Sequence, residues 1–339
     1  MIGAGASPAS LRIGKHLRRR AHWRLPEIVL WSAILAAIVL LPSRAALIDE
    51  ILVAGLFALS LDLILGLAGI VSLGQAAFLG LGAYSAAILA SAGLADPTLG
   101  LLAGAVVAAI VGLATAPLLL RGSDLTRLMV TLGVSLMLGE LANRNSWLTG
   151  GADGLNFSMG RVLGLFPIGF LGQRNAALYS LVVLFVLFAL ARRLRQSPFG
   201  LALAAIRENR LRADALGIAT SRRIIAIYTI SAAYAGVAGA LLAQTTQIVS
   251  LDLFEFHRSA DVMLMLIIGG AGYLYGGLIG AAVFIFLRDV ISAATPEYWE
   301  FWIGALLIVL VMVGRERIRD LALRGASVYR PRPAREQAS

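Results

Sequence analysis

The sequence contains no cysteine, and this absence excludes disulfide bonds, thiolate catalysis and cysteine-based metal sites. Its three histidines, His16, His22 and His257, are not spaced as two ligands on one helix, so the sequence indicates no metal site. Lysine occurs once, at Lys15, and His16 follows it. The chain therefore lacks the Gly-x-x-x-x-Gly-Lys-Ser/Thr loop that binds nucleotide phosphates. We expect no cofactor and no ATP hydrolysis by this chain itself.

Charged residues are also scarce: they make up 14% of the 339 residues, whereas soluble domains carry about 25%. Hydrophobic residues make up 59%, in runs of roughly 17 to 25 residues, the length that a helix needs to cross a hydrocarbon core about 30 Å thick. We predict about eight full spans, the first of them uncleaved, near the following residues: 26–42, 46–66, 75–92, 98–120, 125–142, 175–191, 224–246 and 299–314. The expected fold is an all-α, polytopic bundle of transmembrane helices.

The formal net charge of +10 comes from arginines that lie in blocks between the apolar runs. Such blocks mark cytoplasmic loops, and they explain the charge better than nucleic-acid binding does. The apolar stretch from Ala260 to Arg288 is interrupted by Gly269–Gly277. A single crossing there would place the basic carboxyl-terminal tail outside, so we predict a broken or re-entrant segment and two cytoplasmic termini.

On this topology the outside holds few of the 29 basic residues, namely Arg44, Arg144, Arg161, Arg174, Arg258 and Arg288. The domain organisation is then a basic cytoplasmic tail at 1–25, a transmembrane domain at 26–314 and a second basic cytoplasmic tail at 315–339. Small residues at four-residue spacing, such as Gly100 and Gly104, predict close contacts between helices.

The stretch Leu61–Tyr84 joins two predicted spans without a charged loop, and Gly69 and Gly74 loosen its backbone. Non-helical backbone at membrane depth is tolerated only inside protein or beside a water-filled cavity. Ser72 and Gln75 are therefore candidates to face such a cavity. A tight hairpin at the cytoplasmic surface is the alternative.

Asp62 is the acidic residue that lies well inside an apolar run, where a carboxylate needs a partner or water. It either lines a solute pathway or has a structural role, as a bond to a neighbouring helix or a position near the interface. For Glu140, which lies nearer a helix end, we favour the structural role. Since these two acids are isolated in the sequence and no histidine lies in a span, a membrane-embedded enzyme is not indicated. The candidate pathway residues are Asp62, Ser72, Gly74, Gln75 and Gly80.

The region from Arg192 to Arg223 is long and polar, and Ala205–Gly217 within it has the composition of a helix that ends at a glycine. Its arginines alternate with acidic residues, a pattern that suits docking against another subunit. A solvated surface helix is the alternative. The candidate docking residues are Arg207, Glu208, Asn209, Asp214 and Gly217.

Taken together, these stretches resemble the LivM-type permeases of branched-chain amino-acid ABC importers. The likeness covers roughly residues 50 to 314 and rests on three motifs in order: Ile70–Tyr84, the Gly139-Glu140 pair with Leu148–Leu155, and Ile206–Ile218. That family often has Asn at the position of Asp62. It also commonly has an acidic residue at the position of Ala213, which leaves the detailed docking contacts open.

The resemblance implies a subunit of the bacterial inner membrane that has no enzymatic activity of its own. Its expected partners are a second related permease, two ATP-binding subunits and a periplasmic substrate-binding protein. ATP binding by the partner would move the docked segment near Arg207–Gly217 and switch the permease pair between outward and inward states. A permease for urea, short amides or a sugar is the nearest alternative, and a secondary transporter or channel that works without an ATPase is the other.

Overall fold

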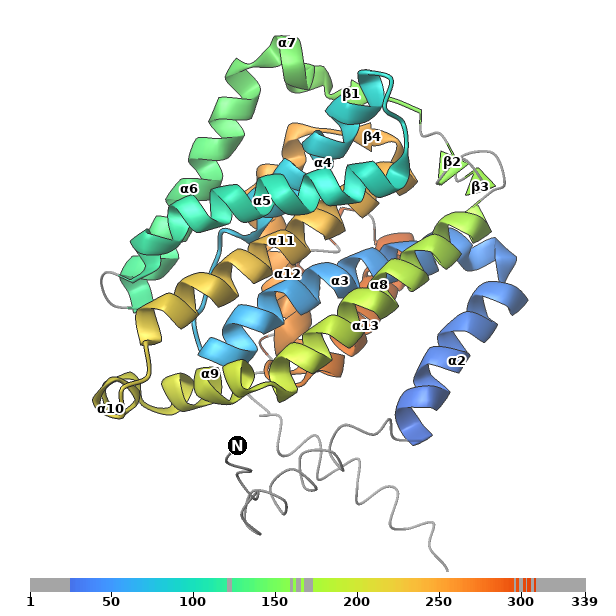
Figure 1. Ribbon diagram of the computed structural model, residues 1–339. Coiled ribbons are helices and arrows are strands. Elements are labelled where there is room, and N and C mark those ends of the chain that lie inside the picture. Colours follow the sequence, from blue (N-terminus) through green and yellow to red (C-terminus); the bar gives the residue numbers. More distant parts are fainter. Residues whose placement is uncertain are drawn as a thin grey trace, which may run out of the picture. The chain divides into compact units, whose positions relative to one another are not determined.

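The computed structural model describes residues 25–120, 124–158, 161–162, 166–167, 173–295, 297–298, 301–302, 304–305 and 308. Most of these residues lie in helices, as the sequence predicts (Figure 1). In chain order the helices are α2 (Leu25–Leu40), η1 (Pro42–Arg44), α3 (Ala45–Ala68), α4 (Gln75–Ser91), α5 (Pro97–Leu119), α6 (Asp124–Arg144), α7 (Ser146–Thr149), η2 (Gly151–Asp153), α8 (Gln173–Gln196), α9 (Pro198–Glu208), α10 (Arg210–Ala215), α11 (Thr220–Thr246), η3 (Leu251–Phe254), α12 (Phe256–Gly269) and α13 (Leu274–Ala294).

Short antiparallel strand pairs connect the loops at the helix ends. The strand β1 (Leu155–Asn156), after α7 and η2, pairs with β4 (Ile248–Val249), after α11. The strand β2 (Arg161–Val162) pairs with β3 (Phe166–Pro167). The first pair joins loops that are far apart in the sequence.

Local sequence signals set several of the helix ends. Asp96 caps α5, because its carboxylate accepts a hydrogen bond from the Thr98 N–H at 3.0 Å and Pro97 occupies the first turn. Ser197 begins α9 in the same way. Helix α3 ends at Gly69, whose φ of 71° is a conformation that glycine adopts without steric cost.

The predicted spans match the observed helices closely. Among the described residues, six helices are long and apolar enough to cross a membrane: Pro42–Ala68, which joins η1 to α3, and α5, α6, α8, α11 and α13. Helices α2 and α4 are apolar but shorter. Most of the predicted last span, 299–314, and both predicted tails lie outside the described residues. The count of eight spans and the sidedness of the termini therefore stay predictions.

The predicted break in the 260–288 stretch is present. Helix α12 ends at Gly269, and α13 begins at Leu274. Between them Gly270 and Gly272 have φ values of 101° and 87°. The two helices pack closely through glycines, since a Cβ atom on Gly280 would lie 1.8 Å from the Met265 carbonyl oxygen.

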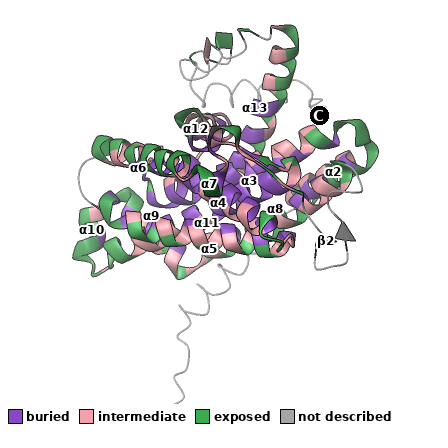
Figure 2. Ribbon diagram, turned by 90° about the horizontal axis from the view of Figure 1, so that it is seen from above, coloured by how far each residue is buried: buried purple, intermediate pink, exposed green. Residues whose placement is uncertain are grey.

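The core of the bundle consists of α3, α4 and α11, which Figure 2 shows as mostly buried. In the most apolar 18 residues of α3 and α11, 83% and 72% of residues are buried, against 22% to 33% in α5, α6 and α8. The latter three helices therefore present apolar side chains outward, as a lipid solvent requires.

Glycines allow the core helices to approach at backbone distance. A Cβ atom on Gly82 of α4 would lie 1.9 Å from the Gly236 carbonyl oxygen of α11, and one on Gly239 would lie 1.8 Å from that of Leu79. Helix α5 meets the same point, because a Cβ atom on Gly236 would lie 2.3 Å from the Gly104 carbonyl oxygen of α5. The small-residue spacing thus marks real backbone contacts.

The residue contacts divide the chain into one compact unit up to Val283 and another from Phe284, a boundary that falls inside α13. In the second unit the rings of Phe301 and Trp302 meet edge to face, with 5.6 Å between their centroids. The features described below all belong to the first unit.

We predict that Gly82→Ala destabilises the isolated chain by about 1–3 kcal/mol, because α4 and α11 must separate to admit the methyl group. Gly133→Ala is the matched control, since Gly133 is an exposed glycine in α6 with no atom within 4 Å of an added Cβ. Helix propensity alone favours both substitutions. Thermal unfolding in detergent measures the difference, and equal midpoints for the two variants would contradict the packing account.

Candidate functional site

Three helices, α3, α8 and α11, connect the same two ends of the bundle. The α9–α10 segment (198–215) follows α8 and precedes α11, so it lies at one end of both (Figure 1). Helix α3 reaches that end with its last turn, where Gly66 accepts a hydrogen bond from Arg207 of α9. The opposite ends of the three helices line one pocket. From Asp49 to Gly69 the rise is about 30 Å at 1.5 Å per residue, which is the thickness of a hydrocarbon core.

The pocket has a volume of about 630 Å³, and we call it the polar pocket. Its charged lining residues are Asp49, Glu50, Asp252 and Arg258. Apolar side chains, among them Leu242, Ile248 and Leu253, complete the wall. The polar pocket thus offers carboxylates, a guanidinium and apolar surface to one small molecule.

Two polar groups in the wall are held in place by the neighbouring helices. The Asp49 carboxylate is buried and accepts a hydrogen bond from the Ser180 hydroxyl of α8. Gln244 of α11 accepts a hydrogen bond from the Tyr179 hydroxyl at 3.1 Å and donates one to the Pro97 carbonyl oxygen at 2.8 Å. The three helix ends around the polar pocket are therefore linked by hydrogen bonds.

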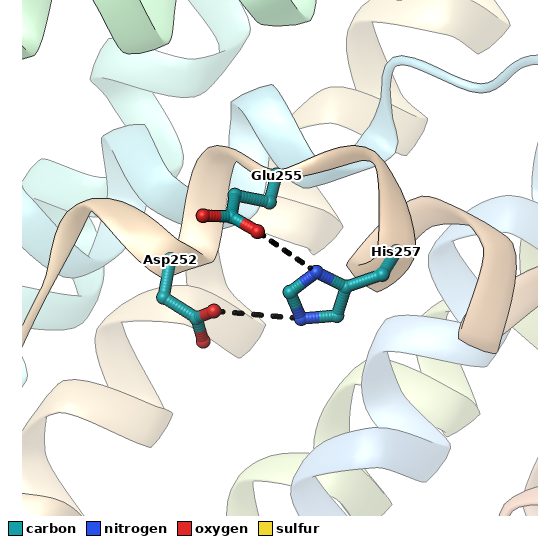
Figure 3. Close-up of side chains that lie close together, drawn as sticks. All are labelled: Asp252, Glu255 and His257. Carbon is teal, nitrogen blue, oxygen red and sulfur yellow. Dashed lines mark ion pairs between the residues drawn. The ribbon is translucent and has the colours of Figure 1, made fainter. Parts of the chain in front are cut away.

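Beside the polar pocket, the imidazole of His257 lies between two carboxylates (Figure 3). Its Nδ1 is 3.1 Å from Glu255 Oε2, and its Nε2 is 3.5 Å from Asp252 Oδ1. One ligand atom from each residue lies within 4.8 Å of the others, but Arg258 already donates to the Asp252 carboxylate at 2.5 Å. We interpret this group as an ion-pair cluster, and the expected absence of a metal stays a prediction.

The segment between α3 and α4 enters the bundle instead of turning at its end. Gln75, the first residue of α4, is fully buried and donates from Nε2 to the Ser231 hydroxyl of α11 at 2.9 Å. Ser231 in turn donates to the Ser60 carbonyl oxygen at 2.6 Å. Because Ser60 lies roughly two turns before the end of α3, α4 begins within the bundle. The segment between α3 and α4 is therefore non-helical backbone buried inside the bundle, and its depth in a membrane stays a prediction.

Side chains from other helices satisfy the backbone donors of this segment. Leu73 N–H donates to the Thr131 hydroxyl at 3.1 Å, and Ala76 N–H donates to the Ser259 hydroxyl at 3.0 Å. Ser72 is fully buried and its hydroxyl accepts from the Gly74 N–H at 3.3 Å. Buried backbone donors in lipid require such partners, because water is absent.

The remaining pathway candidates of this motif are packed tightly inside the protein. A Cβ atom on Gly74 would lie 2.7 Å from the Thr131 carbonyl oxygen, and one on Gly80 would lie 2.7 Å from the ring of Phe254. That ring also stacks on Tyr84, with 5.7 Å between centroids. None of the five predicted pathway residues lines the polar pocket.

Asp62 is buried in α3 and bonds to the break between α12 and α13. Its Oδ1 accepts a hydrogen bond from the Gly272 N–H at 2.6 Å. The positive charges of Arg195 and Arg207 also act on this carboxylate. The structure therefore gives Asp62 a bond to another helix pair, which is one of the two roles that the sequence left open.

The α9–α10 segment is shaped by three of its five predicted docking residues. Asn209 accepts from the Arg212 N–H at 2.9 Å and so caps α10. Asp214 accepts from the Thr220 hydroxyl at 2.5 Å, and Gly217, with a φ of 80°, follows the end of α10. Glu208 ends α9 and is exposed.

Arg207, the fifth docking candidate, reaches toward the bundle. Its Nη1 donates to the Gly66 carbonyl oxygen at 2.6 Å. Ala213 is buried. The docking role of the five predicted residues stays a prediction.

Two exposed leucines on this segment were not singled out by the sequence analysis. Leu211, between Arg210 and Arg212, is 82% exposed, and Leu216, directly after the end of α10, is 74% exposed. The signal that could have identified Leu211 is a large apolar side chain between two arginines in a polar segment. Asp49 and Arg258 were missed as well, because their meeting at the polar pocket depends on which helix ends lie together.

Comparisons with known proteins agree with this organisation. The family described as the permease component of the branched-chain amino acid transport system matches residues 44–311. The high-affinity branched-chain amino acid transport permease LivM of Salmonella typhimurium is 32% identical over 280 residues, and that of Escherichia coli is 31% identical over the same length. Each alignment covers 76% of this chain and 65% of the relative.

The permease LivH of Escherichia coli is 31% identical over 139 residues, which are 40% of this chain and 44% of the relative. No solved structure matches the chain significantly. The family match runs from before α3 to beyond α13 and so includes the polar pocket, the broken helices and the α9–α10 segment. The chain therefore belongs to the permease family of branched-chain amino acid transport systems.

Proposed function

We propose that this chain is a permease subunit of an ATP-binding-cassette importer in the bacterial inner membrane, and that it forms part of the pathway for branched-chain amino acids. The observation that carries the proposal is the shared course of α3, α8 and α11. These helices link the polar pocket at one end to the exposed α9–α10 segment at the other. In this proposal, a movement of the α9–α10 segment is transmitted along these helices to the polar pocket.

In this proposal the polar pocket faces the periplasm and receives the solute from a binding protein. A branched-chain amino acid carries an ammonium group, a carboxylate and an apolar side chain. Asp49 and Glu50 suit the ammonium group, Arg258 suits the carboxylate, and Leu253 belongs to the apolar wall. The same chemistry disfavours urea or a sugar, which carry neither charge.

The deeper pathway is proposed to pass the start of α4. Gln75 Oε1 is buried and accepts no hydrogen bond within the described part of the chain, so it is the atom that we assign to transient solute contact. Ser72 lies beside it in the sequence. Gly74 and Gly80 contribute by keeping this backbone close to Thr131 and Phe254.

The partners follow from the α9–α10 segment and from the missing phosphate loop. Two ATP-binding subunits supply the hydrolysis, and one of them docks against this segment, where the exposed Leu211 and Leu216 offer apolar contacts. A second related permease completes the membrane pathway.

The first test is reconstitution of the chain with its partner subunits. We expect an ATP-binding subunit to co-purify after mild solubilisation, and vesicles to take up leucine only with ATP and the binding protein. Uptake of urea, an amide or a sugar in place of leucine would identify the alternative substrate class. Robust uptake by this chain alone would contradict the importer.

The second test concerns the docking surface. We expect the double substitution Leu211→Ser and Leu216→Ser to weaken binding of the ATP-binding subunit about tenfold or more, since apolar interface anchors contribute about 1–2 kcal/mol each. Leu94→Ser is the control, because Leu94 is 55% exposed after the end of α4, away from this segment. Equal affinity of both variants would place the docking site elsewhere.

The third test concerns the polar pocket. We expect Asp49→Asn to raise the KM for leucine uptake about tenfold, because the amide keeps the size of the side chain and removes the charge that faces the ammonium group. Glu140→Gln is the matched control: Glu140 pairs with Arg144 at 3.0 Å on an exposed surface, where such pairs contribute little. An unchanged KM in Asp49→Asn would exclude this carboxylate from recognition.

A further inference from the structure

We propose that Arg207 is a positioning residue that ties the α9–α10 segment to the end of α3 and to the break between α12 and α13, so that the three move as one body. This inference rests on the proposed function, because it assigns the route by which motion of the docked segment reaches the membrane helices. It concerns contacts within this chain and no partner residue.

The first contact is a cap on the end of α3. Because the chain leaves the helix at Gly69, the last carbonyl groups of α3 lose their helical donors. Ile70 N–H bonds back to the Ile64 carbonyl oxygen at 3.4 Å and not to Gly66. The Gly66 carbonyl oxygen instead accepts from Arg207 Nη1 at 2.6 Å. A positive charge is also favourable at a helix carboxyl terminus.

The second contact joins the same turn of α3 to the broken segment. Asp62, one turn before Gly66, accepts from the Gly272 N–H at 2.6 Å. A Cβ atom on Gly272 would lie 3.1 Å from Arg207 Nη1, and one on Gly66 would lie 2.9 Å from the Gly272 nitrogen. Three segments that are distant in the sequence therefore meet around one guanidinium group.

Charge makes this junction costly to open. Asp62 is 2% exposed, and a buried carboxylate without a nearby cation is strongly unfavourable. The charge of Arg195 on α8 acts on Asp62, and so does that of Arg207. If α9 moved away alone, the Gly66 carbonyl would lose its donor and the buried carboxylate would lose a cation. Moving α9, the end of α3 and the α12–α13 break together avoids both losses.

The apolar face of α9 cannot supply this coupling by itself. Leu203 and Ile206 are buried and hold α9 against the bundle, but apolar contacts are non-directional and permit sliding. A hydrogen bond from a guanidinium to one carbonyl oxygen fixes the register. Removal of Arg207 should therefore leave α9 attached and make it slip.

In the reconstituted complex, we expect Arg207→Gln to keep ATP hydrolysis within about twofold of wild type while leucine uptake falls about tenfold, so that more ATP is used per leucine. Arg212→Gln removes an exposed arginine from the same segment and should leave this ratio unchanged. Equal losses of hydrolysis and uptake, or no loss at all, would contradict the proposal. A wild-type complex without ATP-driven uptake would instead overturn the proposed function.

A disulfide gives a second, reversible test, because the chain has no cysteine of its own. A Cβ atom on Gly69 would lie 3.7 Å from the Cβ of Arg207, within the range of disulfide bonds, although the φ of 71° at Gly69 strains any residue that has a side chain. In the double variant Gly69→Cys and Arg207→Cys, we expect low uptake per ATP when reduced and recovery on oxidation. The single variants and the wild type should not respond to the oxidant. Failure to cross-link, or a further loss of uptake on oxidation, would show that the two positions do not move together.

Discussion

Most of this structure depends on one constraint: in lipid, every backbone polar group needs a partner within the protein. Regular helices satisfy the constraint along most of the chain. Between α3 and α4, and between α12 and α13, the backbone is not helical and its polar groups need other partners. At the first break the hydroxyls of Thr131 and Ser259 accept hydrogen bonds from backbone N–H groups, and at the second break the carboxylate of Asp62 accepts one. The breaks are possible only because side chains from other helices reach them.

The same constraint explains why Asp62 is buried in an apolar bundle and why the exposed residue Arg207 reaches back to the end of α3. A carboxylate is a strong acceptor for a backbone N–H, and a guanidinium is a strong donor to a carbonyl oxygen. Asp62 and Arg207 use these properties on either side of one turn of α3. Both charged side chains thus serve as structural partners of backbone groups in other segments.

Close contacts at glycines hold the core helices together. With no hydrophobic force to drive helices together in lipid, the contact between α4 and α11 depends on van der Waals packing at backbone distance. Gly82, Gly236 and Gly239 provide that approach, and the core helices α3 and α11 are mostly buried whereas α5, α6 and α8 are not.

The sequence by itself determined the membrane class, the positions of most helices, the break near Gly269–Gly277 and the polar segment that became α9 and α10. These features are local, because span length, glycine conformation and helix caps depend on neighbouring residues. Only the tertiary structure decided that Asp62 meets Gly272, that Arg207 reaches Gly66 and that Asp49 and Arg258 share a pocket. These residues are far apart in the sequence, and one chain carries no signal for which helix ends meet, since packing against other helices sets that arrangement.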